Sequence, residues 1–364
     1  MRVARGGMDK VLLSAVLLIA FLGIFFIYSA TWDWQTESGH FSVFVIKQCV
    51  WVIIGMIFLF ILAASDYLKI LNYAYVLYIL NLLALVFLLL FGGERYGARR
   101  WITFGPISIQ PSEFVKITVI LVLAAFLGDR REKIGTIKNY IASIALVLPA
   151  AALIFLQPDL GTAFVLVPIL FSILFISGEK IKHIVLTMAA GLASIPFFWM
   201  FLKDYQKNRL MVFLNPDLDP LGAGYTIIQS KIAVGSGGMA GKGWLSGTQS
   251  YLNFLPERHT DFIFSVVGEE WGFLGGVALI LLYAFIVARG IRIMSRVPDV
   301  QGKAIAAGVV ILIAFQVLVN IAMTIGLMPV VGLPLPAISY GGSNTLATLI
   351  SVGLLLGISR RIER

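Results

Sequence analysis

Long apolar runs separated by polar connections dominate the chain. Ten of these runs approach the roughly 20 residues that a helix needs to cross the hydrocarbon core of a bilayer. They lack the apolar–polar alternation of barrel strands, so helices are expected. The predicted spans are about 11–30, 42–64, 71–91, 113–127, 139–156, 162–177, 182–202, 263–288, 304–327 and 344–359. The pattern therefore predicts an all-α fold, a polytopic membrane bundle of about ten transmembrane helices in one domain over residues 1–364.

The basic residues predict the orientation of this bundle. An even number of spans places both termini on the same side of the membrane. Of the 28 Lys and Arg residues, 17 fall on that side, 9 fall on the other side and 2 lie within spans. Because cytoplasmic connections are enriched in Lys and Arg, we expect a multi-pass membrane protein with both termini in the cytoplasm.

One connection, at about residues 203–262, is much longer than the others and would face outward. It is rich in glycine, yet it also contains Trp244, Tyr251 and Phe254, and the run Tyr225–Val234 predicts a short surface helix. Long connections in compact proteins are usually functional or disordered, and the aromatic residues argue against disorder. We therefore expect a folded, functional loop.

The composition narrows the classes of function. Apolar residues make up 59% of the chain, charged residues make up 13%, and the mean hydropathy is +0.93. Soluble domains average about 45–50% apolar and about 25% charged residues, so a soluble enzyme and a disordered chain are excluded. The net charge of +9 does not indicate nucleic-acid binding, because the basic residues flank apolar runs instead of forming one stripe. The single cysteine excludes an intrachain disulfide, and the three histidines have no metal-ligand spacing.

Charged residues end the long loop just before an apolar run. A proline turn is followed by Glu257, Arg258, His259 and Asp261. A carboxylate in this interfacial zone loses hydration, which raises its pKa toward a value useful in general acid–base catalysis. Alternatively, Asp261 caps the N-terminus of the eighth span, with Thr260 assisting. The sequence leaves both roles open.

Several ionisable residues lie inside or beside the predicted spans. Such residues are costly in a membrane and are therefore candidates for function. Glu113 and Lys116 are three residues apart, so they share a helix face and could form an ion pair that only fixes the helix register. Asp159 lies in an outward turn between two spans, and Glu269 and Glu270 follow the loop carboxylates by about two turns.

Several cations lie on the predicted outward side, although Lys and Arg are usually enriched on the cytoplasmic side. Their charge would be balanced by an anionic ligand such as a diphosphate or a phospholipid head group, for which arginine supplies forked contacts. Ordinary contacts with lipid phosphates are the alternative. These cations are Arg95, Arg99, Arg100, Lys207 and Arg209.

Two segments rich in glycine interrupt the regular pattern. Residues 235–243 resemble a phosphate-binding loop only loosely, since they lack the required spacing and a preceding strand, and simple turns explain them equally well. Residues 326–343 combine glycine and proline between two spans. Irregular backbone at membrane depth lines a cavity or is buried in protein, so we expect a cavity near the outer surface.

These features fit two classes of function. One is an enzyme that acts on a lipid-linked anionic substrate, and the other is a transporter or flippase that moves such a lipid. The ionisable residues cluster on the outer side, which favours chemistry there. A scaffold would explain the hydrophobicity but not the clustered charges.

Longer motifs resemble the SEDS family (shape, elongation, division and sporulation), from the first span to the last. The sequence just before Asp261 and the short cytoplasmic tails are more similar to the elongation members of this family than to its division members. The motifs are Gln110-Pro-Ser-Glu-Phe-Val-Lys116, Gln157-Pro-Asp-Leu-Gly-Thr162, Gly222-Ala-Gly-Tyr225, Phe254-Leu-Pro-Glu-Arg-His-Thr-Asp261, Glu269-Glu270, Gly326-Leu-Met-Pro329 and Ser339-Tyr-Gly-Gly-Ser343.

The resemblance implies a peptidoglycan glycosyltransferase that polymerises lipid II, an undecaprenyl-diphosphate disaccharide-pentapeptide, into β-1,4 glycan strands at the outer face of the cytoplasmic membrane. The family's essential loop acid matches Asp261, and our hypothesis makes it the general base. A lipid II flippase is the alternative. Residues that the resemblance assigns to substrate binding are Glu113, Lys116, Asp159, Gln206 and Arg209.

The resemblance also implies partners, namely a class B penicillin-binding protein with transpeptidase activity and the elongation machinery, and no nucleic acid. Lipid II carries its own diphosphate leaving group, so we expect that no cofactor is required. Arg209 and Lys116 would offset the diphosphate charge. A divalent cation (Mg or Mn) could assist them, and the sequence identifies no metal ligands.

Overall fold

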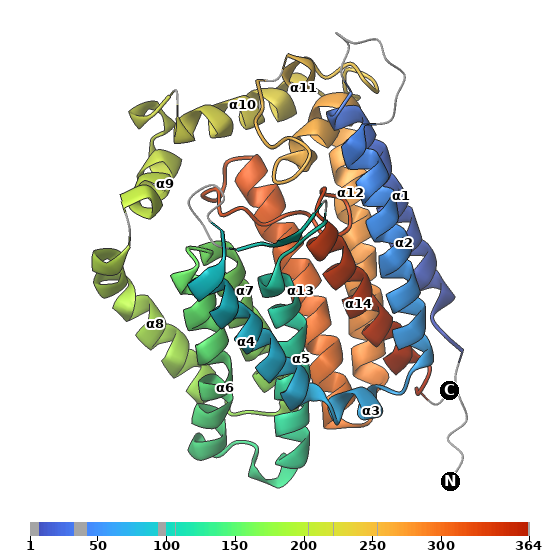
Figure 1. The fold of residues 1–364 in the computed structure, drawn as a ribbon, viewed down its shortest axis with the longest axis vertical. Coiled ribbons are helices and arrows are strands. Elements are labelled where there is room, and N and C mark those ends of the chain that lie inside the picture. Colours follow the sequence, from blue (N-terminus) through green and yellow to red (C-terminus); the bar gives the residue numbers. More distant parts are fainter. Residues whose placement is uncertain are drawn as a thin grey trace.

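The computed structural model describes residues 7–32, 42–93, 100–105, 107–202, 204–220, 222–252 and 254–362, and these form a helical bundle (Figure 1). Nine helices in this part of the chain are long and apolar enough to cross a membrane. They coincide with nine of the ten predicted spans, and the largest difference is that α12 continues past residue 288. The nine are α1 (Lys10–Ala30), α2 (Val43–Ala64), α4 (Ala74–Phe91), α5 (Pro111–Asp129), α6 (Ile137–Leu156), α7 (Leu160–Ser177), α12 (Ile263–Arg296), α13 (Val300–Thr324) and α14 (Gly342–Ser359).

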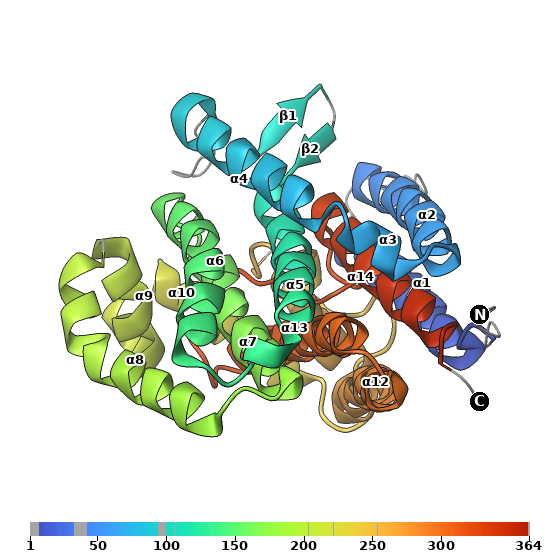
Figure 2. The ribbon, with the colours of Figure 1, turned by 90° about the horizontal axis from the view of Figure 1, so that it is seen from below.

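The remaining predicted span, at about 182–202, is also helical. It forms α8 (Ile181–Phe201), whose apolar stretch covers Ile181–Phe197. This helix lies at the edge of the bundle (Figure 2), and large side chains such as Leu186 and Leu192 are exposed along it. Exposed apolar side chains are expected on a helix that faces lipid, because lipid tails are as apolar as the side chains. Together with the nine, this helix gives the predicted polytopic membrane bundle.

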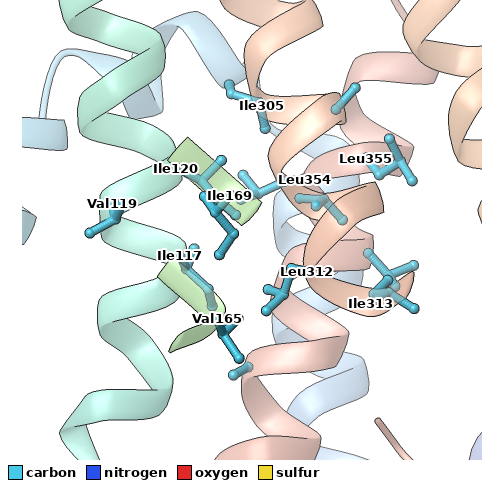
Figure 3. Close-up of a cluster of buried hydrophobic side chains, with 14 of the residues drawn as sticks. Ile117, Val119, Ile120, Val165, Ile169, Ile305, Leu312, Ile313, Leu354 and Leu355 are labelled. Carbon is cyan, nitrogen blue, oxygen red and sulfur yellow. The ribbon is translucent and has the colours of Figure 1, made fainter. Parts of the chain in front are cut away.

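The centre of the bundle is formed by α5, α13 and α14, which are largely buried, whereas α2 and α4 expose most of their surface. Figure 3 shows the packing at this centre, where Ile120 of α5 and Ile169 of α7 lie near Ile305 of α13 and Leu354 of α14. Gly308 of α13 permits this approach, since a Cβ there would lie 2.7 Å from Cγ1 of Ile120. Close approach at small residues is the usual basis of helix packing in membranes.

Close packing at a glycine also joins α2 to α14. A Cβ at Gly353 of α14 would lie 2.8 Å from the carbonyl oxygen of Leu59 in α2. We therefore expect Gly353→Ala to destabilise the protein by about 1–3 kcal/mol, because the backbone of α2 would have to move. Gly191→Ala in α8 is the matched control, since no atom lies within 4 Å of its Cβ position. Thermal unfolding in detergent would measure both, and an equal melting temperature for the two variants would contradict the packing argument.

The two ends of the bundle differ in character. At one end the backbone N–H of Asp9, before α1, donates to Ser359 Oγ at the end of α14 at 3.3 Å. The two ends of the described helical region therefore lie on one side, as predicted for an even number of spans (Figure 1). This end also carries α3 (Tyr67–Leu71) and η1 (Arg131–Lys133).

The opposite end carries the long connection, which is folded as predicted. It forms α9 (Asp204–Leu214), η2 (Pro216–Leu218), α10 (Ala223–Ser236) and α11 (Thr248–Tyr251), and α10 includes the predicted helix Tyr225–Val234 (Figure 1). A short antiparallel hairpin of β1 (Ile102–Phe104) and β2 (Ile107–Ile109) joins α4 to α5.

The glycine-rich run 235–243 forms turns that pack on α12. The backbone N–H groups of Lys242 and Gly243 donate to the carbonyls of Glu269 and Glu270, each at 3.0 Å. In return, the N–H of Phe273 donates to the carbonyl of Gly238 at 2.8 Å, where α12 is broken at Gly272 by a φ of +64°. The N–H groups of Lys242 and Gly243 are used within the protein, so the structure favours turns over the phosphate-binding interpretation of this run.

Candidate functional site

Asp261 lies at the end of the long connection, immediately before α12, and is half-buried. The helix begins at Ile263, its N-cap is Phe262, and no side chain caps it. The N–H of Phe262 donates instead to the carbonyl of Glu257 at 3.3 Å, so a tight turn precedes the helix. The alternative prediction that Asp261 caps this helix is therefore wrong, because the turn places it one residue too early.

The backbone around Asp261 is held by three consecutive carbonyls. The carbonyl of His259 accepts from the N–H of Tyr340 at 2.8 Å, and the carbonyl of Thr260 accepts from Ser339 Oγ at 2.6 Å. The carbonyl of Asp261 accepts from Asn320 Nδ2 at 2.9 Å. Because these contacts use only backbone carbonyls, they position the Asp261 carboxylate without occupying its oxygens.

The Asp261 carboxylate has an elevated pKa. Burial raises the pKa to about 6, and the negative charges of Glu257 and Asp159 act in the same direction. The positive charges of Arg209 and Arg100 oppose this rise. No described residue donates a hydrogen bond to the carboxylate. A half-buried carboxylate with a pKa near neutrality and no donor is suited to accept a proton.

Asp159 is the second acid of the site, and it caps α7. Its carboxylate accepts from the N–H and Oγ1 of Thr162 at 3.2 and 3.0 Å and from Gln110 Nε2 at 3.2 Å. Arg100 Nη1 lies 3.8 Å from Asp159 Oδ1, and the same guanidinium donates to the carbonyls of Gln157, at 3.0 Å, and Pro158. Three hydrogen-bond donors and the Arg100 guanidinium therefore surround the Asp159 carboxylate, which in turn helps to position Arg100.

The irregular segment 330–333 brings the separate parts of the site together. The carbonyl of Val330 accepts from Arg209 Nη1 at 3.2 Å. A Cβ at Gly161, in the first turn of α7, would lie 2.5 Å from the next carbonyl, and a Cβ at Gly332 would lie 3.5 Å from Asp261 Oδ2. The segment therefore contacts the Arg209 side chain, the Asp159 helix and the Asp261 carboxylate in turn.

Glu113 and Lys116 form the predicted ion pair. Lys116 Nζ lies 2.7 Å from Glu113 Oε2, and both side chains are buried in the first turns of α5. Neither of them forms an ion pair with Asp261 or Asp159 within the described chain. The pair lies one turn beyond Gln110, which contacts Asp159, so it supports the N-terminal end of α5 from within the bundle.

The remaining predicted cations and polar residues lie around this centre. Gln206 and Arg209 are on α9, with Gln206 buried and Arg209 exposed apart from its contact with Val330. Lys207 is half-buried on the same helix. Arg95 and Arg99 lie outside the described residues, so of the three arginines in this region only Arg100 is placed.

Three residues of the site were not assigned a role from the sequence. Ser339 and Gln110 lie in the motifs and Asn320 lies six residues before Gly326-Leu-Met-Pro329. The partners of all three are distant in the chain, with Ser339 and Thr260 separated by 79 positions. The position of Ser339 within the predicted irregular segment 326–343 was the available signal. Asn320 also donates to the carbonyl of Leu333 at 2.8 Å, so it links that segment to Asp261.

His259, unlike Asp261 nearby, is not suited to accept a proton at the site. Its ring packs against Phe44 and Tyr340, and burial lowers its pKa, so it is neutral at physiological pH. Across the described ranges, no group of three or more His, Cys, Asp or Glu residues could hold a metal ion. Among the described residues, the cations that act on the Asp261 carboxylate are the guanidinium groups of Arg209 and Arg100.

Comparisons with known proteins match this architecture over its full length. The family model described as "Cell cycle protein", for FtsW, RodA and SpoVE, matches residues 9–364. The chain belongs to the FtsW/RodA/SpoVE family. Family members include the peptidoglycan glycosyltransferase MrdB of Escherichia coli (strain K12), 40% identical over 96% of this chain and 94% of MrdB. The peptidoglycan glycosyltransferase RodA of Treponema pallidum (strain Nichols) is 35% identical over 97% of this chain and 98% of that protein.

Solved structures of the family share the fold. A chain from a peptidoglycan synthase complex, studied for the structural coordination of polymerization and crosslinking, superposes with a TM-score of 0.82 at 33% identity, covering 98% of this chain and 99% of that chain. The crystal structure of Thermus thermophilus RodA gives a TM-score of 0.74 at 31% identity, with 98% of each chain covered. The FtsW/RodA/SpoVE fold is thus the fold of this chain, and the recognised SEDS resemblance is confirmed.

Proposed function

We propose that this protein is a peptidoglycan glycosyltransferase that polymerises lipid II into β-1,4 glycan strands during cell elongation. Membership of the FtsW/RodA/SpoVE family supports the reaction class. The single observation that carries the mechanism is the Asp261 carboxylate, which has a pKa of about 6, no hydrogen-bond donor among the described residues, and two guanidinium groups acting on it.

In the proposed reaction, Asp261 accepts the proton of the 4-hydroxyl group of one GlcNAc. The hydroxyl oxygen forms a bond to the anomeric carbon of the second sugar, and the bond from that carbon to the diphosphate oxygen breaks. Undecaprenyl diphosphate leaves with the electron pair. A sugar hydroxyl is far too weak an acid to ionise beforehand, so the proton moves to Asp261 in the transition state.

The charge that develops on the diphosphate requires fixed cations. Arg209 supports this role best, because its residue is exposed and, within the described part of the chain, its guanidinium donates only to the carbonyl of Val330. Arg100 acts on the same carboxylate but is also engaged with Asp159. Lys116 is buried against Glu113, so it supports the helix more directly than it could contact the diphosphate. Glu113, Lys116, Asp159 and Gln206 would shape the substrate site around these cations.

We place the site at the outer face of the cytoplasmic membrane and both termini in the cytoplasm, as the distribution of Lys and Arg favours. The proposed partners are a class B penicillin-binding protein and the elongation machinery. A similar chain that is part of a peptidoglycan synthase complex supports the first partner.

Polymerisation of lipid II by the purified protein in detergent tests this function. Detergent provides no second leaflet, so glycan polymer would show chemistry that a flippase alone does not perform. We expect polymer in the presence of the transpeptidase partner. If the protein moved lipid II in vesicles but formed no polymer in detergent, the flippase alternative would replace the proposal. The same assay with and without a chelator measures whether a divalent cation is needed.

The pH dependence of this reaction follows from the pKa of Asp261. The base must be ionised in the free enzyme, and its pKa is raised to about 6. We therefore expect kcat/KM to fall about tenfold for each pH unit below 6 and to level off above it. A profile that shows no group near pH 6, or activity that increases toward low pH, would argue against Asp261 as the base.

A further inference from the structure

Two buried side chains, Asn320 and Ser339, connect separate parts of the site. Asn320 lies near the end of α13, and Ser339 lies shortly before α14 begins. Each of them contacts both the turn 259–261 and the segment 330–335. Neither side chain has exposed surface, so neither can touch a substrate. Any effect on the reaction must therefore act through the backbone that they hold.

The Asn320 amide makes the first connection through its nitrogen. Nδ2 donates to the carbonyl of Asp261 at 2.9 Å and to the carbonyl of Leu333 at 2.8 Å. Because a carbonyl oxygen only accepts hydrogen bonds, these two contacts require the amide nitrogen, and not the amide oxygen, at this position. Oδ1 is buried and has no partner within the described chain. The contacts of Asn320 with the site are therefore its two N–H donors.

The Ser339 hydroxyl makes the second connection. Oγ donates to the carbonyl of Thr260 at 2.6 Å and accepts from the backbone N–H of Leu335 at 2.8 Å. Thr260 precedes the residue that Asn320 holds on the turn, and Leu335 lies two residues beyond the one that Asn320 holds on the segment. Asn320 and Ser339 thus span the same two pieces of backbone side by side, and together they are termed the double bridge.

The segment 330–335 also contacts the charged groups of the site. The carbonyl of Val330 accepts from Arg209 Nη1 at 3.2 Å. Gly332 lies against the Asp261 carboxylate, since a Cβ there would be 3.5 Å from Oδ2, and its φ of +72° is one that glycine adopts readily. The double bridge therefore links the backbone of Asp261 to the short run of chain that orients the Arg209 guanidinium.

The separation of Asp261 and Arg209 matters for the proposed reaction. Asp261 would accept a proton from one sugar while Arg209 offsets the charge of the diphosphate that leaves the other, so both must fit one reacting centre. Arg209 lies on α9 and is exposed, and the contact with Val330 orients its guanidinium. Misplacement of a group by about 1 Å can cost about 100-fold in rate. Loss of a donor from the double bridge would leave a buried carbonyl unpaired, which is costly, so the backbone on both sides would shift.

We propose that Asn320 and Ser339 are positioning residues that set the separation between Asp261 and Arg209 during glycan polymerisation. This inference rests on the proposed function of the two charged residues. The double bridge supplies no group to the reaction itself. It holds the base and the cation in register, so its removal lowers the rate of the chemical step more than it weakens the binding of lipid II.

Steady-state kinetics of lipid II polymerisation by the full-length protein with its transpeptidase partner test this proposal. We expect Ser339→Ala and Asn320→Leu each to lower kcat about 10–100-fold and to change KM by about threefold at most. Ser351→Ala is the matched control for the serine, because Ser351 is fully buried in α14 and donates to the carbonyl of Ala347 in its own helix at 2.8 Å. Gln316→Leu is the control for the amide, because Gln316 lies one turn earlier on α13, is buried, and has an Nε2 without a partner in the described ranges. Both controls should polymerise lipid II at the wild-type rate.

A double-mutant cycle with Arg209→Ala separates positioning from stability. A loss of folded protein multiplies every rate by the same factor and leaves the effect of Arg209→Ala unchanged. A lost register instead removes the benefit of Arg209 beforehand. We therefore expect Arg209→Ala to lower kcat/KM at least about threefold less in the Ser339→Ala background than in the wild-type protein, as is usual for coupled residues. In the Ser351→Ala background it should have its full effect.

An equal effect of Arg209→Ala in the Ser339→Ala background and in the wild-type protein would overturn the proposal. A wild-type kcat in Ser339→Ala would overturn it as well, and either result would assign the double bridge a structural role only. Ser339→Ala removes a single oxygen atom, so its cycle decides the matter even where Asn320→Leu does not fold. A wild-type protein that formed no polymer would contradict the proposed function instead, so the two failures are distinguishable.

Discussion

Asp261→Asn should lower the rate of glycan polymerisation by about 10²–10⁴-fold, the range that general base catalysis contributes. The amide is close in size to the carboxylate, but it does not accept the proton of the sugar hydroxyl. The variant should still fold, because the carbonyls of residues 259–261, and not the carboxylate, make the contacts that hold this backbone. The measurement is gel analysis of polymer formed from lipid II by the purified variant with its transpeptidase partner.

Asp217→Asn is the control for this experiment, since Asp217 is an exposed acid in η2 and belongs to the same connection. It should polymerise lipid II at the wild-type rate. If Asp261→Asn did so too, Asp261 would not be the base, and the search would move to other acids near the site. Gel filtration and thermal unfolding of both variants would separate loss of chemistry from loss of fold.

Arg209→Ala should reduce kcat/KM for lipid II by about 10–100-fold, because a fixed cation near the diphosphate would be lost. It should also move the acid limb of the pH profile upward. The positive charge of Arg209 lowers the pKa of Asp261, so its removal raises that pKa and more of the base is protonated at a given pH. Arg209→Lys should restore part of the activity, since it keeps the charge but loses the forked geometry.

Lys207→Ala provides the comparison for Arg209, because Lys207 lies two residues away on α9. It should change kcat/KM severalfold at most and leave the pH profile in place. A loss of folded protein in Arg209→Ala that matched its loss of activity would point to a structural role through the contact with Val330. An unchanged acid limb would separately contradict the electrostatic coupling to Asp261.

The hydrophobic pattern predicted the helices of this protein well because the membrane imposes it. A span must be apolar and about 20 residues long, so the spans could be located without knowledge of their neighbours. The Glu113–Lys116 pair was predictable for a similar reason, since residues three apart share a helix face. Asp261 and Arg209 were found from the resemblance and from their unusual charge in an outward loop.

Contacts between distant parts of the chain could not be predicted in this way. Asp261 was equally compatible with a helix cap, and only the turn that ends at Phe262 excludes that role. Asn320 and Ser339 act on residues 59 and 79 positions away, and Ser29 meets Glu270 across 241 positions. No local pattern encodes such distances, because they depend on how α1, α12, α13 and α14 pack together.

The break at Gly272 has a consequence for where charge can lie in α12. The 34 residues of α12 would form a rod about 51 Å long at 1.5 Å per residue, well beyond the roughly 30 Å thickness of the hydrocarbon layer. The break and the two hydrogen bonds that fix it, from Phe273 and Leu274 to residues 238 and 239, leave a straight rod of about 36 Å for crossing this layer. The first nine residues of α12, 263–271, therefore pack with the long connection at the end of the bundle and not within the membrane-crossing rod. This explains why the adjacent Glu269 and Glu270 are tolerated in a segment that the sequence alone presents as one continuous span.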